Sequence, residues 1–184
     1  MDFREITEFL KDFAGFIFTF LVMVLIFAFV IALQPVAGNS MHSTLKEGDV
    51  VVVSRFSYKI GKPKRNEIVT VKDDDKKSYI KRVIGLPGEK IHYLNGVLYI
   101  NDEPQRETFL DEGMETGNFM FEDICPKEKC PNGVIPEEMY MLMGDNRLWS
   151  VDSRTPEFGL RNIKDIDGKV LVRIWPLNTF GSVK

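Results

Sequence analysis

Histidine and cysteine are scarce in this sequence of 184 residues, which contains two of each. The two cysteines have no histidine near them, so they do not complete the four-ligand set of a structural zinc site. His42 is tethered too closely to the best serine candidate, Ser40, and His92 lies in a predicted hairpin strand. A Ser-His-Asp triad is therefore not expected, because its histidine must reach the serine hydroxyl. We expect neither a metal site nor an organic cofactor.

An excess of basic residues is also missing, because 24 lysines and arginines stand against 27 acidic residues. Residues 34–184 alone carry 22 basic and 23 acidic side chains. Nucleic-acid binding depends on contacts with phosphate and normally leaves a basic patch or stripe in the sequence. The charge balance therefore argues against nucleic acid as a partner.

One stretch of the chain has no charged residue at all. Residues 14–33 read AGFIFTFLVMVLIFAFVIAL. As a helix these twenty residues span about 30 Å, the thickness of a bilayer's hydrocarbon core. The run is apolar around its whole circumference, which predicts a retained membrane anchor. The alternatives are a buried core helix, which rarely lacks a polar face over this length, and a cleavable signal peptide, for which the stretch is too long.

The basic residues near this stretch predict its orientation. Arg4 and Lys11 precede it, whereas Lys46 is the only basic residue among the twenty that follow Leu33. The excess of positive charge favours a cytoplasmic N-terminus. The chain then divides into a cytoplasmic tail (1–13), a single transmembrane anchor (14–33) and an exterior domain (34–184), of which roughly residues 95–140 form an inserted, less catalytic part.

The exterior domain has the pattern of a mainly β, antiparallel fold. No segment after Leu33 keeps a helical period, and glycine and proline interrupt the chain frequently. Asn95-Gly96 between two apolar runs is a strong signal for a hairpin. The predicted strands are 49–53, 67–71, 79–84, 90–94, 97–101 and 169–175.

Cys125 and Cys130 stand close together in the segment CPKEKC. Two nearby cysteines outside the cytoplasm suit a small disulfide-closed loop. Unpaired thiols are the alternative.

Ser40 is a candidate nucleophile close to the membrane. It follows Leu33 by seven residues, which reach at most about 25 Å when fully extended. A serine hydroxyl needs a base, and a lysine can take that role in place of histidine.

The best candidate for this base is Lys81, in SYIKRVIGLPG. In a strand, Lys81 shares a face with Tyr79 and Val83, and Arg82 lies on the other face. Burial among apolar neighbours lowers the pKa of a lysine, so that a neutral amine can accept the serine proton. The alternative is a lysine whose ammonium group extends into solvent.

A third segment, GDNRLWSVDSR at residues 144–154, combines acids, arginines, serines and an asparagine. It is either part of a site or a turn locked by its own side chains. Leu148 and Trp149 are unusual in a solvated turn and indicate contact with lipid or substrate.

Taken together, three segments resemble the bacterial type I signal peptidases, which are membrane-anchored serine endopeptidases with a Ser-Lys dyad. The segments are SMHSTLKEGD (40–49), YIKRVIGLPGE (79–89) and GDNRLWSVDSR (144–154), in the family's order after an N-terminal span. The resemblance covers essentially the whole chain, and the single span is most similar to the Gram-positive branch.

The resemblance implies a role for each matching residue. Ser40 is the nucleophile, with its backbone N–H binding the oxyanion, and Lys81 is the general base. Ser150 hydrogen-bonds the catalytic amine. The residues that shape the site through salt bridges are Asp145, Arg82, Asp152 and Arg154, and those near shallow substrate pockets are Met41, Leu45 and Ile80.

Two positions depart from the family's pattern. Ser43 stands where the family usually has proline, so we expect a less rigid turn after the nucleophile. Gly38 stands where some members have a serine that supplies a second oxyanion donor, and glycine has no hydroxyl to replace it.

The resemblance also implies the reaction and its location. The expected substrates are secreted pre-proteins, whose signal peptides have small side chains at the first and third positions before the cut and bind as an added strand. Cleavage passes through an acyl-enzyme at the outer face of the cytoplasmic membrane, with the lipid bilayer as second partner. The alternatives are another Ser-Lys hydrolase, such as a self-cleaving protease, and a non-catalytic membrane-anchored β module.

Overall fold

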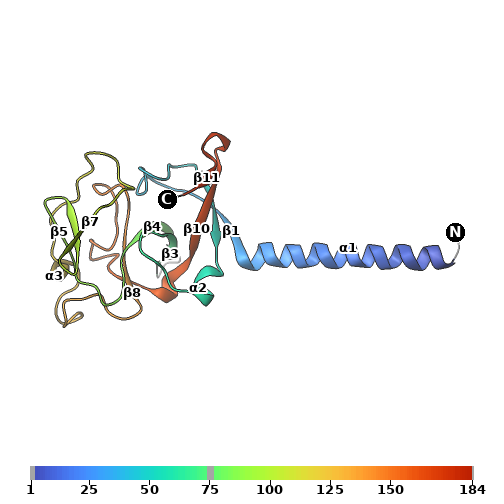
Figure 1. The fold of residues 1–184 in the computed structure, drawn as a ribbon, viewed down its shortest axis with the longest axis horizontal. Coiled ribbons are helices and arrows are strands. Elements are labelled where there is room, and N and C mark those ends of the chain that lie inside the picture. Colours follow the sequence, from blue (N-terminus) through green and yellow to red (C-terminus); the bar gives the residue numbers. More distant parts are fainter. Residues whose placement is uncertain (1–2, 74–76, 184) are drawn as a thin grey trace.

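The computed structural model describes residues 3–73 and 77–183 (Figure 1). It begins with one long helix, α1 (Phe3–Val30), which projects from a β-sheet domain that contains the rest of the chain. Within α1, Thr7–Phe27 is long and apolar enough to cross a membrane. Its most apolar stretch has a mean hydropathy of 2.1, and none of that stretch is buried. An apolar helix whose membrane-length part is not buried fits an anchor better than the core of a soluble domain.

The helix ends three residues before the end of the predicted anchor. Residues 31–33 instead belong to strand β1 (Ile31–Pro35), which pairs antiparallel with β2 (Val50–Ser54) and sets Leu33 opposite Val52. This pairing gives the backbone N–H and C=O groups of β1 hydrogen-bond partners in β2, so these groups do not need the partners that a continued helix would supply. The apolar run therefore continues directly into the sheet domain.

The main sheet is antiparallel and curls into a half-barrel, which confirms the predicted fold class. Its strand order is β1-β2-β10-β3-β4-β8-β9, and β11 pairs with the far part of β10. Four of the predicted strands occur here, as β2, β3, β4 and β10. The bounds not yet given are β3 (Ile68–Lys72), β4 (Ser78–Gly85), β8 (Met139–Met143), β9 (Arg161–Asn162), β10 (Ile166–Trp175) and β11 (Gly181–Ser182).

A smaller sheet of three strands, β5 (Ile91–Leu94), β6 (Val97–Ile100) and β7 (Glu103–Gln105), lies beside the main sheet. Asn95 and Gly96 form the turn between β5 and β6 with positive φ at both residues, which confirms the predicted hairpin. Short helical turns occur elsewhere, at α2 (Ser57–Ile60), α3 (Phe121–Ile124), Ile163–Asp165 and Leu177–Thr179.

The two sheets share a core at the end of β4. Ile84 packs there with Ile91 and Phe121 of the small-sheet region. Gly85 makes this approach possible, because a Cβ at this position would collide with the side chains of Ile91 and Ile135. The small sheet is thus held against the strand that carries Lys81.

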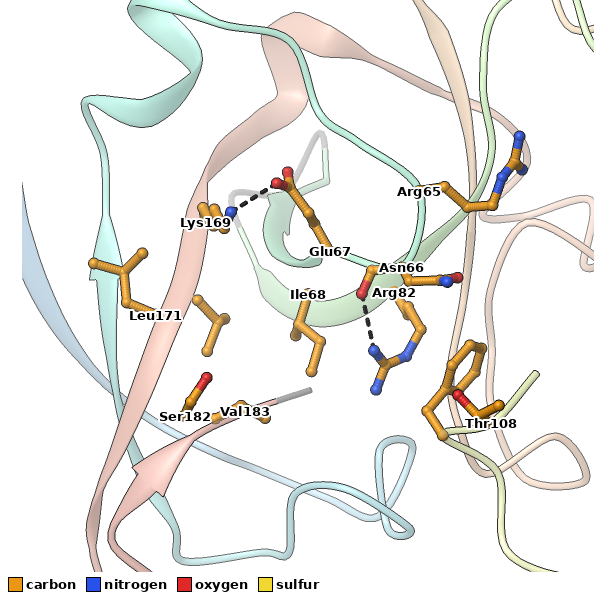
Figure 2. Close-up of a pocket in the computed structure, with 12 residues that line it drawn as sticks. Arg65, Asn66, Glu67, Ile68, Arg82, Thr108, Lys169, Leu171, Ser182 and Val183 are labelled. Atoms are coloured by element: carbon orange, nitrogen blue, oxygen red, sulfur yellow. Dashed lines mark hydrogen bonds and ion pairs between the residues drawn. The ribbon is translucent and has the colours of Figure 1, made fainter. Parts of the chain in front are cut away.

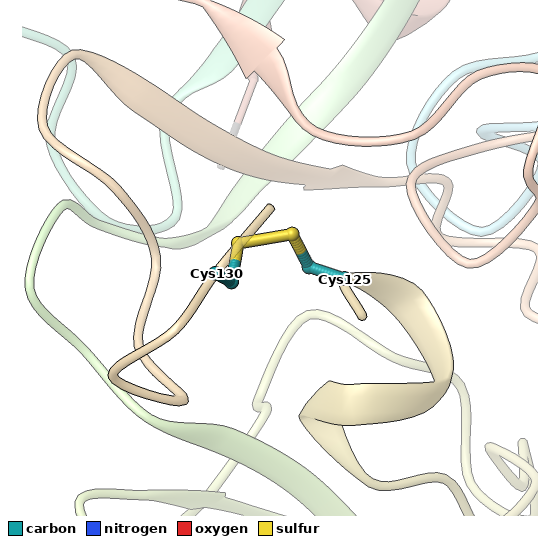
Figure 3. Close-up of a disulfide and its surroundings, with 2 residues drawn as sticks. All are labelled: Cys125 and Cys130. Atoms are coloured by element: carbon teal, nitrogen blue, oxygen red, sulfur yellow. A yellow bond between two sulfur atoms is a disulfide. The ribbon is translucent and has the colours of Figure 1, made fainter. Parts of the chain in front are cut away.

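Cys125 and Cys130 form a disulfide just after α3 (Figure 3). Both cysteines are buried in the core shared by the two sheets. The structure thus favours the disulfide-closed loop over unpaired thiols.

Candidate active site

Lys81 lies in the middle of β4, opposite Val69 of β3, and only 2% of it is exposed. Its Nζ donates a hydrogen bond of 2.9 Å to the Ser150 hydroxyl. Burial lowers the pKa of Lys81 from 10.5 to about 8, while Asp152 raises this pKa and Arg154 lowers it. The ammonium group does not extend into solvent, so the alternative of an exposed lysine is wrong.

Arg82, the next residue in β4, makes a different set of contacts. Its Nε and Nη2 donate to the two carboxylate oxygens of Asp145 at 2.8 and 2.7 Å. Both side chains are fully buried, so the charge of each one is compensated by the other and not by water. The Arg82 Nη1 also donates to the Asn66 carbonyl at 2.9 Å.

Thr44 joins this ion pair to the turn that contains Ser40. Its hydroxyl accepts a hydrogen bond from Arg82 Nη2 at 3.1 Å and donates one to Asp145. The Thr44 backbone N–H bonds the Met41 carbonyl at 2.8 Å and closes the same turn. The buried pair thereby fixes the turn that follows the predicted nucleophile.

The backbone of Ser40 is held by the third predicted segment. The Asn146 N–H donates to the Ser40 carbonyl at 3.0 Å, and the Asn146 side chain donates to the Asn39 carbonyl at 3.0 Å. These two bonds join residues more than 100 positions apart in the chain. They attach the turn at Ser40 to the segment that carries Ser150.

Gly144 lets Ser40 and Ser150 come together. A Cβ at Gly144 would collide with the Ser40 carbonyl oxygen and the Ser150 hydroxyl, and would lie 2.6 Å from the Ser150 Cβ. Only glycine leaves room for this approach. Ser40 therefore lies next to Ser150, which is itself bonded to Lys81.

Asp152 and Arg154 support the same segment from within. Arg154 donates through Nε and Nη2 to the two carboxylate oxygens of Asp152, both at 2.8 Å. Burial acts to raise the Asp152 pKa, but the bonds from Arg154 and from the Gly144 N–H lower it overall. Asp152 is thus a charged acceptor that fixes the Gly144 backbone.

The three predicted substrate-binding residues belong to one hydrophobic cluster. Met41, Leu45 and Ile80 pack there with residues of β2, β3 and β10. Met41 and Leu45 are almost completely buried, and Ile80 is 7% exposed. In this structure their side chains are part of a buried apolar wall rather than an open surface.

One pocket of the structure lies away from Ser40. It has a volume of about 590 Å³ and lies on the Arg82 side of the sheet, between Glu67, Lys169, Val183 and Phe109 (Figure 2). Its lining includes neither Lys81 nor Ser150, so it is separate from the hydrogen bond between these two residues. An open depression of about 520 Å³ adjoins the Ser40 turn and is lined by Asn39, His42, Asn146 and Trp149.

The structure thus brings the predicted residues of all three segments into one connected network. The sequence did not identify three further members, of which Gly144 and Asn146 belong to a segment already singled out. Thr44 had no signal beyond its position in a hydroxyl-rich stretch. Within residues 3–73 and 77–183, no group of three or more His, Cys, Asp or Glu side chains is arranged to hold a metal ion.

Fold and site together define a β-sheet protein with one apolar N-terminal helix and a buried lysine that is bonded to one serine, with a second serine beside that one. Residues 7–175 match the family model described as signal peptidase, peptidase S26. The chain is 35% identical to signal peptidase IB of Staphylococcus aureus (strain COL), over 96% of this chain and 93% of that protein. It is 41% identical to signal peptidase I of Bacillus caldolyticus, over 83% of this chain and 84% of that protein.

A solved structure gives the same result. The crystal structure of a signal peptidase I from Enterococcus faecalis V583 superposes with a TM-score of 0.50 at 31% identity, covering 60% of this chain and 97% of that one. The chain belongs to the signal peptidase family, peptidase S26. This membership confirms the predicted resemblance and the predicted enzyme class, a serine endopeptidase of the signal peptidase type.

Proposed function

We propose that the chain cleaves signal peptides with Ser40 as nucleophile and Lys81 as general base. One observation carries this assignment: the buried Lys81 amine, with a pKa lowered to about 8, is bonded to Ser150, and Ser150 adjoins Ser40 across Gly144. A base with a pKa near the working pH combines a sizeable neutral fraction with enough strength to take a proton.

The reaction then proceeds through an acyl-enzyme. The Ser40 hydroxyl oxygen attacks the scissile carbonyl carbon while Lys81 Nζ takes the hydroxyl proton. The tetrahedral intermediate collapses, the C–N bond breaks, and the ammonium of Lys81 returns the proton to the leaving amine of the mature protein. Lys81 next deprotonates a water molecule, which attacks the ester carbonyl carbon. The bond between that carbon and the Ser40 oxygen breaks, the ammonium of Lys81 returns the proton to the Ser40 oxygen, and the signal peptide leaves with a free carboxylate.

The remaining network positions these groups. The Ser150 hydroxyl accepts the Lys81 hydrogen bond and aims the amine. Asn146 holds the Ser40 carbonyl, which leaves the Ser40 N–H as the proposed donor to the oxyanion. Fixing both residues before the substrate binds reduces the reorganisation that the reaction requires.

The substrates are the signal peptides of secreted pre-proteins. In our proposal the segment before the cut binds as an extended strand, with small side chains at its first and third positions facing Met41, Leu45 and Ile80. The burial of these three apolar side chains supports shallow subsites, because little of their surface is open to a side chain of the substrate.

We place the catalytic domain on the outer face of the cytoplasmic membrane. The apolar Thr7–Phe27 segment supports a single span, and Arg4 and Lys11 support a cytoplasmic N-terminus. Strand β1 starts directly after the helix and Ser40 follows β1 by five residues, so the lipid bilayer lies close to the turn that contains Ser40. Protease added to intact cells should digest the β domain, and its protection would contradict this orientation.

The dyad is tested with a purified full-length enzyme and a pre-protein that has alanines at the cut. Ser40→Ala and Lys81→Ala should each lose at least about a thousandfold in kcat, since removing the nucleophile or the base of a serine protease can cost roughly a millionfold. Lys164→Ala is the matched control, because Lys164 is exposed and outside the network. Near-full activity of either dyad variant would overturn the assignment.

The same variants separate the alternatives. A self-cleaving protease would lose its own processing with Ser40→Ala but would leave the pre-protein intact even as wild type. A non-catalytic module would cleave neither substrate in any form.

A further inference from the structure

Arg147 is a buried cation that the proposed mechanism does not use. It follows the turn at Gly144, and its side chain is completely buried. Its Nη1 donates to Tyr93, Glu107 and Thr116 at 2.9, 3.0 and 2.7 Å, and its Nη2 donates to Glu107 at 2.5 Å. Such complete pairing of a guanidinium away from water indicates a fixed position.

The partners of the Arg147 Nη1 and Nη2 groups come from the small-sheet region and not from the main sheet. Tyr93 lies in β5, while Glu107 and Thr116 lie in the segment after β7. This region overlaps the part that was predicted to be less catalytic. Phe109, two residues after Glu107, also places its ring 4.0 Å from the Arg82 guanidinium. The same loop therefore touches two arginines of the site.

Arg147 also holds the backbone of the segment that contains Ser150, the catalytic segment (residues 144–154). Its Nε donates to the Gly144 carbonyl at 3.1 Å, and Asp152 accepts from the Gly144 N–H at 3.0 Å. Arg154 donates to the Arg147 carbonyl at 2.8 Å. Gly144 is thus held from both sides at the point where Ser40 and Ser150 meet.

We propose that Glu107 and Arg147 are positioning residues for the cleavage reaction, through which the small sheet fixes the catalytic segment. The inference rests on the proposed Ser-Lys dyad. Glu107 compensates the Arg147 charge and orients its guanidinium, and the guanidinium fixes the Gly144 carbonyl. A small shift of Gly144 moves Ser150 away from Lys81 and Ser40 away from Ser150.

The expected loss of kcat follows from the geometry of the site. A misplacement of about 1 Å in an active site can reduce a rate by about a hundredfold. Glu107→Gln keeps the size of the side chain but removes the charge that pairs with Arg147. We expect kcat to fall by about 10- to 100-fold, with KM changed less than about twofold because the proposed substrate wall is not altered.

The first experiment compares Glu107→Gln with Glu89→Gln in the full-length enzyme. Glu89 is a matched control, because it also pairs with an arginine, Arg65, is mostly buried and touches no residue of 144–154 in the described structure. Active-site titration corrects kcat for unfolded molecules. The acid limb of the pH profile is a second readout, since a displaced Ser150 changes the surroundings of Lys81. Equal kcat and equal acid limbs in the two variants would overturn the proposal.

A double variant separates positioning from stability. Replacing both charges, in Glu107→Gln/Arg147→Met, leaves no unpaired buried charge, and such replacements often restore stability. We expect its melting temperature to recover towards the wild-type value while kcat stays at least about tenfold low. Recovery of kcat together with stability would show a purely structural role.

Glu107→Asp is the conservative variant that completes the series. It keeps the charge on a shorter side chain and should regain part of the lost kcat. Failure of the dyad is recognised separately, because Ser40→Ala would then remain active in the same assay whatever Glu107 does.

Discussion

Lys81 should set the pH range in which the enzyme works. Burial lowers its pKa from 10.5 to about 8. At pH 7 roughly 10% of the amine is then neutral, against about 0.03% for an ordinary lysine, so burial supplies about 300-fold more base. Because the base must be neutral, kcat/KM should rise about tenfold for each pH unit below pH 8 and level off above it.

The same pKa shift reduces the stability of the folded protein. The folded-state pKa of Lys81 lies below the unfolded value, so the unfolded chain binds more protons between about pH 8 and 10.5. The cost of the buried ammonium, roughly 3 kcal/mol, is fully present below pH 8 and disappears as pH rises through this window. Lys81→Met should therefore be inactive but more stable than wild type at pH 6.5.

Two measurements test this reasoning. Initial rates on a pre-protein from pH 5 to 10 give the acid limb, and urea unfolding of wild type and Lys81→Met at pH 6.5 and 10.5 gives the stability difference. The difference should shrink at the higher pH. A flat rate profile down to pH 5, or a Lys81→Met variant that is less stable at pH 6.5, would refute the account of a neutral buried base.

The packing at Gly144 and the ion pair at Asp145 give two further predictions. Gly144→Ala introduces a Cβ that collides with the Ser40 carbonyl oxygen and the Ser150 hydroxyl, so kcat should fall at least about a hundredfold. Gly117→Ala, which meets nothing within 4 Å, is the control, and similar kcat values would contradict this packing argument. Asp145→Asn leaves Arg82 buried without its counter-charge and should cost about 3–5 kcal/mol in urea unfolding. Asp167→Asn removes the partly exposed ion pairs that Asp167 makes with Lys72 and Arg55, and it should cost at most about 1 kcal/mol. Equal losses in the two variants would argue against a role for burial.

The alternation of β4 could be predicted from the sequence, but the partners of its side chains could not. A period of two separates Lys81 from Arg82 on any strand, and the structure gives them different partners, Ser150 and Asp145. These partners lie 69 and 63 residues away in the chain. No local pattern specifies such distances, because they depend on how β8 pairs with β4.

The end of the first helix shows a different limit of sequence patterns. Ile31 and Leu33 are apolar whether they continue a membrane helix or enter a sheet. Hydropathy therefore could not separate the two elements, and the pairing of β1 with β2 decides the boundary at Val30. The charge-free run was correctly predicted to contain a helix, because its length exceeds any ordinary strand.

The division of the exterior domain was the least predictable part. The hairpin at Asn95 gave a clear signal, but the polar residues that follow it show no period. Glu107 is one such residue, and its contact with Arg147 crosses 40 positions. A buried ion pair of this kind is indistinguishable in sequence from two solvated charges, since both residue types are usually exposed.

Charge balance connects these observations. Three acid–arginine pairs surround the proposed dyad: Asp145 with Arg82, Asp152 with Arg154, and Glu107 with Arg147. Each pair is close to neutral as a unit, so the opposing influences of Asp152 and Arg154 on the Lys81 pKa partly cancel and burial has the largest effect. A single unpaired carboxylate beside the amine would stabilise its charged form and remove the base at neutral pH. The arginines thus allow acidic residues to fix the backbone of the site without stabilising the protonated form of Lys81.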